Sequence, residues 1–152
     1  MAQPTAYSFL NVQGSLIGPG GNVNVGAGSG SSEEGVTVSM VEEKGDYKVG
    51  ADGQVMQSLR ASNLGHISVR LLKTSPTNAL LMGMYNAQKT NAGLWGQNVL
   101  RFSDVQRGDV ILGTQMAFTK PPDIVYAKDG NMNEWTFVGN VETLLGTGTP
   151  TA

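Results

Sequence analysis

The strongest constraint on the fold is the alternation of apolar and polar residues between positions 7 and 26. Side chains alternate between the two faces of a strand, so Leu10, Val12 and Leu16 are expected on one face. The opposite face would be polar but uncharged, and the pattern resumes after the turn Gly18-Pro19-Gly20-Gly21. The residues expected on this neutral face are Asn11, Gln13, Ser15, Asn22 and Asn24. The pattern predicts a β-hairpin with strands at about 7–17 and 22–26.

Similar alternation predicts further short strands along the chain. In the third, 35–41, Thr37 and Ser39 form another neutral polar face, opposite Val36 and Val38. Between this strand and the next lies a charged, turn-rich segment, 42–53, with turn signals at Lys44-Gly45 and Asp52-Gly53. The remaining strands are expected at 54–61, 66–73, 97–103, 109–119, 123–127 and 133–144.

A helix is expected over residues 76–89. Ser75 is a suitable N-cap, Pro76 fits the first helical position, and apolar residues from Leu80 to Tyr85 recur at helical spacing. The predicted fold is therefore mainly β, an antiparallel β-sandwich or part-barrel with one flanking α-helix. We expect a single domain over residues 1–152, with flexible tails at 1–5 and 146–152.

Charge is scarce in this chain. Asp, Glu, Lys and Arg make up 14% of the residues, against about 25% in typical soluble domains. Depletion of charge is typical of interface cores, so the composition favours an oligomer. The net charge is −2 and the basic residues are scattered, which argues against specific nucleic-acid binding. No signal peptide or membrane-spanning segment is recognised, so we expect a cytosolic chain without a membrane partner.

The residues that catalysis or metal binding would need are few. There is no cysteine and only one histidine, His66, for which the sequence offers no catalytic partner. Members of the pairs Glu33-Glu34 and Glu42-Glu43 would point to opposite faces of a strand. The spacing of Asp46 and Asp52 does not match a calcium-binding loop. We therefore expect no enzymatic activity, no cofactor and no metal.

Three stretches of the chain carry a family resemblance. They are residues 7–12 running into Gly18-Pro19-Gly20-Gly21, residues 33–37 running on to Gly50-Ala51-Asp52-Gly53, and residues 69–82. The third is the most specific, because it joins a strand, a helix cap and a helix in fixed register. Together they resemble the inner tail tube proteins of contractile-tailed bacteriophages and prophages, and the similarity spans roughly residues 6–145.

The resemblance implies a β-sandwich with one flanking helix that assembles into hexameric rings. Each subunit of such a ring contributes four strands to a continuous inner barrel, and stacked rings form the channel for DNA ejection. The implied location is the virion tail, after assembly in the host cytoplasm. The implied partners are other copies of the chain and the tail sheath, baseplate and tape-measure proteins, with DNA passing through without specific binding.

Combining the resemblance with the strand pattern gives two groups of candidate residues. Those expected to face the lumen share a short, neutral, polar side chain: Asn11, Gln13, Ser15, Asn22, Asn24, Thr37 and Ser39. Those expected in a ring-stacking loop are charged residues of segment 42–53: Glu42, Glu43, Lys44, Asp46, Lys48 and Asp52. The Gly/Ser-rich loop 27–34 is the second choice for stacking.

Two other classes of protein remain open at this point. A monomeric β-sandwich that binds a ligand would explain the strands and the two tryptophans, Trp95 and Trp135, but not the low charge. A related ring protein, from a secretion-system tube or a tail-completion ring, would share nearly every feature described above.

Overall fold

The computed structural model describes residues 8–26, 31–104 and 107–146. It contains a short 3-10 helix, η1, one α-helix and nine strands within these ranges. Their bounds are η1 (Phe9–Asn11), β1 (Val12–Gly18), β2 (Gly21–Asn24), β3 (Ser31–Met40), β4 (Gly45–Val49), β5 (Val55–Leu59), β6 (Leu64–Leu72), α1 (Thr77–Gln88), β7 (Asn98–Asp104), β8 (Asp109–Phe118) and β9 (Met132–Leu144).

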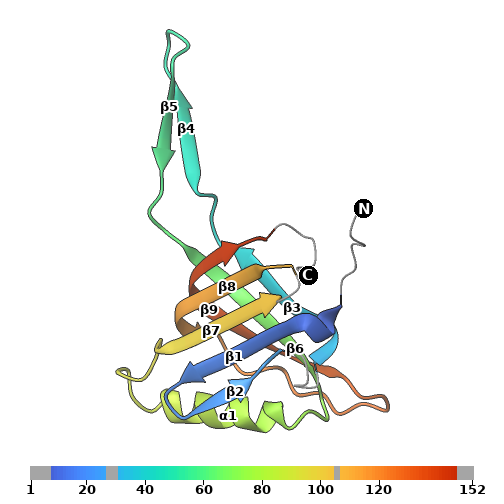
Figure 1. Cartoon of the computed structure of the whole chain (residues 1–152). Helices are drawn as coiled ribbons and strands as arrows, with labels where there is room; N and C mark the ends of the chain where they lie inside the picture. Colours follow the sequence, from blue (N-terminus) through green and yellow to red (C-terminus); the bar gives the residue numbers. More distant parts are fainter. Residues whose placement is uncertain (1–7, 27–30, 105–106, 147–152) are drawn as a thin grey trace, which may run out of the picture.

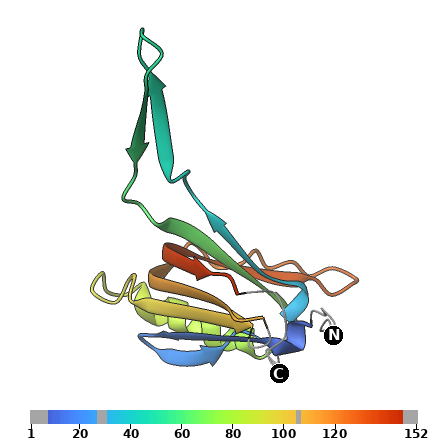
Figure 2. The ribbon, with the colours of Figure 1, turned by 45° about the horizontal axis from the view of Figure 1, so that its top comes forward.

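Seven strands form one antiparallel sheet in the order β2-β1-β7-β8-β9-β6-β3. The sheet curves until its two ends lie in separate layers, with β1, β2 and β7 opposite β3 and β6 (Figure 2). The edge strands β2 and β3 do not pair with each other, so the barrel stays open. The mainly β architecture with one helix is confirmed, as is the sandwich-like arrangement of its layers.

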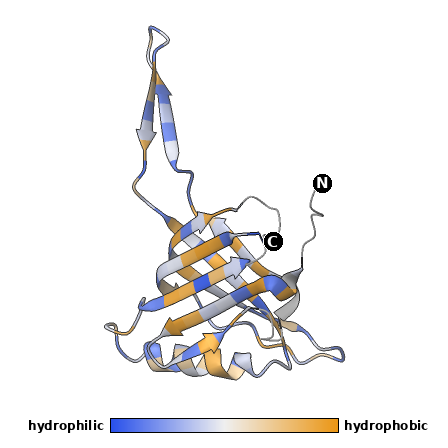
Figure 3. Cartoon of the chain, in the orientation of Figure 1, coloured by the Kyte–Doolittle hydropathy of each residue, from blue (hydrophilic) through white to orange (hydrophobic). Residues whose placement is uncertain are grey.

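The core lies between these layers. Apolar side chains alternate with polar ones along the strands (Figure 3), and the inward set includes Leu16 and Phe102 from one layer and Ile67, Trp135 and Phe137 from the other, all nearly inaccessible to water. Burial of such side chains is the dominant stabilising term of the fold. Trp135 is therefore a core anchor, and its indole Nε1 donates to Asn78 Oδ1 at 3.0 Å.

Helix α1 lies beside β2 and buries Leu81 and Met84 (Figure 1). It begins one residue later than expected, and Ser75 Oγ accepts a hydrogen bond from the Thr77 N–H at 3.3 Å. Leu80, expected within the apolar stripe, is exposed; Leu81 and Met84 are buried in the core, and Tyr85 packs against it.

A buried amide pair fixes the end of this helix to the sheet. Gln88 and Asn98 exchange two hydrogen bonds of 2.7 and 2.8 Å. Gln88 also donates to the carbonyl of Pro19, and Asn98 to that of Met116. A Cβ on Gly18 would lie 2.0 Å from Asn98 Oδ1, so only glycine fits beside the pair.

One expected strand is wrong. Residues 123–127 have the composition of a strand, but they run as irregular chain between β8 and β9. A strand needs a hydrogen-bonded neighbour, and both long edges of β9 are already occupied by β8 and β6.

Two further expectations need correction. The first strand begins at Val12 rather than residue 7, because Phe9–Asn11 form η1. The segment 42–53 is not only a turn: it contains β4, which pairs with β5 in a separate two-stranded hairpin closed around Gly53, whose φ is +86°. The expected tails lie outside the described residues, except Gly146.

The amide pair gives a test of the fold. Asn98→Ala leaves the buried amide of Gln88 without its partner, so the free energy of unfolding should fall by about 1–3 kcal/mol. Gln97→Ala, at the exposed neighbouring position, is the control and should change it little. Urea denaturation followed by circular dichroism measures both variants. Equal stability of the two would contradict the structural role of the pair.

Candidate assembly surfaces

The hairpin of β4 and β5 stands away from the curved sheet (Figure 1). All of its strand residues are exposed. An isolated two-stranded hairpin is at best marginally stable in water, since it has no core of its own. Its exposure therefore points to a contact made with another molecule.

The hairpin has one predominantly apolar face. Tyr47 lies opposite Gln57, Val49 opposite Val55, and Leu59 follows on the same side. Tyr47 is 67% and Leu59 83% exposed. The other face carries Asp46, Lys48, Met56 and Ser58. The sequence analysis missed the apolar face, although the apolar positions on either side of the Gly50–Gly53 turn were a signal for it.

The charged residues near the hairpin base interact within the chain. Arg60 lies 3.7 Å from Glu42 and 3.9 Å from Asp46, and its guanidinium also donates to the carbonyl of Glu43. Lys44 Nζ donates to Asn63 Oδ1 at 2.9 Å. Exposed pairs of this kind contribute little to stability.

The remaining stacking candidates lie further along the hairpin. Asp52 is in its turn, where its Oδ1 accepts from the Gln54 N–H at 3.1 Å, and Lys48 lies opposite Met56. Of the second-choice loop 27–34, residues 27–30 lie outside the described part, and the backbone of 31–34 belongs to β3.

The outward side of β3, β6 and β9 carries mostly polar side chains, about half of them short hydroxyl residues, and has no net charge. We call it the hydroxyl face; its residues are Thr37, Ser39, His66, Ser68, Arg70, Glu134, Thr136 and Val138. Ser68 and Thr136 share a hydrogen bond across the strands. Arg70 pairs with Glu134 at 3.0 Å and also donates to Thr37. The two full charges of this face therefore neutralise each other.

The outward side of β2, β1 and β7 has a different chemistry. We call it the amide face; it carries Gln13, Ser15, Ile17, Asn22, Asn24, Val99, Arg101 and Ser103. Ser15 lies between Asn24 and Arg101 in the register of the strands. Ile17 and Val99 are exposed apolar side chains on the same face.

The structure divides the lumen candidates between these two faces. Val12 and Val36 point into the same cavity from opposite layers, so their outward neighbours Gln13 and Thr37 point in opposite directions. Asn11 belongs to η1 and lies on neither face. Apart from Asn11, the lumen candidates therefore lie on two faces: Gln13, Ser15, Asn22 and Asn24 on the amide face, and Thr37 and Ser39 on the hydroxyl face.

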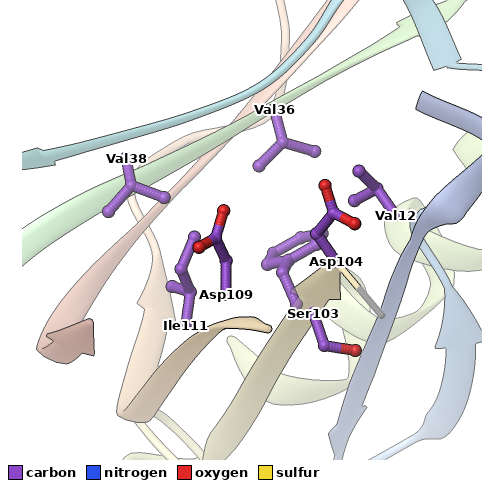
Figure 4. A pocket seen from close by; sticks show the side chains of 8 residues that line it. Val12, Val36, Val38, Ser103, Asp104, Asp109 and Ile111 are labelled. Atoms are coloured by element: carbon purple, nitrogen blue, oxygen red, sulfur yellow. The ribbon is translucent and has the colours of Figure 1, made fainter. Parts of the chain in front are cut away.

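A cavity of about 170 Å³ lies between the two layers, lined by residues of β1, β3, β7 and β8 (Figure 4). Val36 and Val38 of β3 face Val12 and Ile111 across it, and Asp104 and Asp109 also line it. Asp109 Oδ1 accepts from the Gly146 N–H at 2.8 Å. Strand β3 borders this cavity, and its free edge pairs with no described strand.

Comparison with known proteins decides the family. The model of the bacteriophage PhiTE tail tube protein family matches residues 4–146. The chain belongs to this family. This agrees with the resemblance seen in the sequence. The protein is therefore a structural protein of a phage tail.

The fold of this tail tube family member is also found in a solved structure. The cryo-EM structure of the anti-feeding prophage cap, described as the tube terminating cap, matches with a TM-score of 0.56 and 10% identity. The match covers 96% of this chain and 95% of that one. No curated protein sequence matches the chain.

Among the described residues, no three His, Asp or Glu side chains are grouped to hold a metal ion. In the same part of the chain, no helix has the length and apolar character needed to cross a bilayer.

Proposed function

We propose that this protein assembles into hexameric rings that stack into the inner tube of a phage tail, through which DNA is ejected. The observation that carries the proposal is the incompleteness of the subunit: its sheet ends in a free edge, and its hairpin is exposed on every side. Identical copies can satisfy both features, around the ring and along the axis. Membership of the tail tube family supports this assembly.

The hydroxyl face is the better candidate for the channel wall. Its short side chains leave the bore smooth, and the paired Arg70 and Glu134 leave no row of free cations to bind phosphates. Thr37 and Ser39 are its lumen candidates. The amide face, with Ile17, Val99 and Arg101, suits contact with protein such as the sheath.

The hairpin is the candidate for contact between rings. Its apolar side chains would be buried on a neighbouring copy, which would supply the packing that an isolated hairpin lacks. Lys48 and Asp52 remain candidates for setting register in this contact. Glu42, Glu43, Lys44 and Asp46 would act indirectly, through the orientation of the hairpin base.

The further partners proposed for such a tube are the baseplate, the tape-measure protein and the sheath, with assembly in the host cytoplasm. A terminating or tail-completion ring is the second candidate function, because the likeness to the tube terminating cap spans nearly the whole chain. Negative-stain imaging of the purified protein separates the two: long tubes support the tube, and single rings at every concentration support the cap.

The channel assignment predicts an effect of added positive charge. Thr37→Lys combined with Ser39→Lys should slow DNA ejection, since a ring would then present rows of cations to the phosphates. Ser15→Lys with Asn24→Lys, at paired positions on the amide face, is the matched control. Ejection rates from assembled particles measure both. Slowing by the control alone would place the amide face in the lumen, and normal rates in both would contradict a channel wall on either face.

The stacking assignment predicts that the hairpin is dispensable for folding but needed for tube growth. Replacing residues 46–58 with Asn-Gly, a two-residue hairpin turn, should leave a folded subunit that forms no tubes. Val49→Asn with Val55→Asn should weaken tube growth more than Lys48→Asn with Met56→Asn, the cross-strand pair on the other face. Circular dichroism checks folding and electron microscopy measures tube length. Normal tubes from the shortened chain would show that the hairpin does not join the rings.

A further inference from the structure

The segment 123–127 has residues that favour a strand, but it pairs with no described strand. Ile124, Val125 and Tyr126 have high β-propensity, and all three are exposed, Tyr126 by 86%. Within the described chain, their backbone N–H groups donate no hydrogen bond to another backbone group. Three consecutive apolar residues displayed in this way are unusual on a free surface.

A lysine side chain that follows β6 contacts the segment. Lys73 Nζ donates to the carbonyl of Val125 and lies 3.9 Å from the centre of the Tyr126 ring. Pro121 and Pro122 precede the segment, and neither has an N–H to enter a ladder. The apolar side chains of the segment stay exposed, and the segment joins no strand of its own subunit among the described residues.

The same chain contains an edge of matching length. The pairing of β3 with β6 is irregular before Val36 and regular over Val36–Met40, which is five residues, as in 123–127. No described strand covers the other side of this stretch. The second edge strand, β2, is shorter, and α1 packs against its start, where Gly21 lies beside Met84. The edge of β3 is therefore the more open of the two.

The rest of the sheet limits what can continue this edge. Strands β8 and β9 are each paired on both sides within the subunit, so neither can join the β3 of another copy. A free segment at the β8–β9 connection can do so. The cavity beside β3 adds a receptor for apolar side chains, since Val36, Val38 and Ile111 line it. A strand added here would direct alternate side chains, such as Ile124 and Tyr126, toward this cavity.

We infer that residues 123–127 of one subunit add as a strand to the free edge Val36–Met40 of the next, forming the seam between neighbouring subunits of the ring. This inference rests on the proposed ring assembly and names the segments that make it. Backbone hydrogen bonds supply adhesion, and the apolar side chains fix the face. The expected strand at 123–127 thus forms only in the assembly.

Disulfide trapping tests the seam, because the chain has no cysteine of its own. Cysteine is placed at Thr37 or Ser39 and, in the same chain, at Ile124, Val125 or Tyr126, which gives six double variants. Paired strands bring Cα atoms to about 4.5–5.5 Å, within the range for a disulfide. After mild oxidation, at least one double variant should give a ladder of covalent oligomers in denaturing gels, up to the size of the ring.

Two controls make the result specific. The single-cysteine variants should give no species beyond a dimer, and Thr37→Cys with Ala92→Cys, which has one cysteine outside the seam, should give no ladder. Electron microscopy before oxidation separates the two failures. Chains that form no rings would contradict the proposed function itself, whereas intact rings with no ladder from any of the six variants would overturn this seam alone.

Discussion

The free edge of β3, which pairs with no second strand among the described residues, is the constraint on which the proposed assembly depends. The sheet curves far enough to enclose a core but stops before β3 meets the opposite layer. A cavity between Val36 and Val12 separates β3 from the opposite layer. An open edge of this kind is a liability in a solitary protein and an adhesive surface in a polymer. An unpaired edge that would promote aggregation in a monomer can therefore serve as a specific contact when the neighbouring molecule is a copy placed by symmetry.

The interior of the subunit is built to hold these surfaces still. Trp135 and Phe137 pack with Phe118 in a cluster of aromatic rings. The pair Gln88 and Asn98 joins the helix to β7, to β8 and to the turn between β1 and β2. A buried polar network that is fully bonded favours one arrangement over its alternatives. Such rigidity would matter in the proposed tube, because each ring contact would be repeated along its axis and small errors in a subunit would accumulate.

Much of the subunit follows from local sequence pattern. Strict alternation identified β1, β2, β6 and β9, and the Ser75-Pro76 start located α1 within a residue or two. Alternation alone could not show which polar strand faces lie on the same side of the folded subunit, because that depends on how far the sheet curves. Gln13 and Thr37 are alike in chemistry but lie on opposite sides of the sandwich.

The errors share a physical cause, which is that a strand depends on its partner. Residues 123–127 favour a strand but pair with no described strand of the subunit. Tyr47 and Val49 lie in a segment that was expected to be a charged turn, yet they pair with Gln57 and Val55 across the hairpin turn. β-propensity mainly measures how well a side chain fits such a paired surface. Pattern alone is therefore weakest at the segments that the assembly uses.

Hydrogen–deuterium exchange of the free subunit and of the assembled tube tests most directly whether the subunit is completed by its neighbours. We expect the backbone amides of Gly45–Val49, Val55–Leu59 and 123–127 to exchange fast in the free subunit and to be strongly protected in the tube. β6, central in the sheet, should exchange slowly in both states. Strong protection of the hairpin and of 123–127 already in the free subunit, or no gain on assembly, would contradict this expectation.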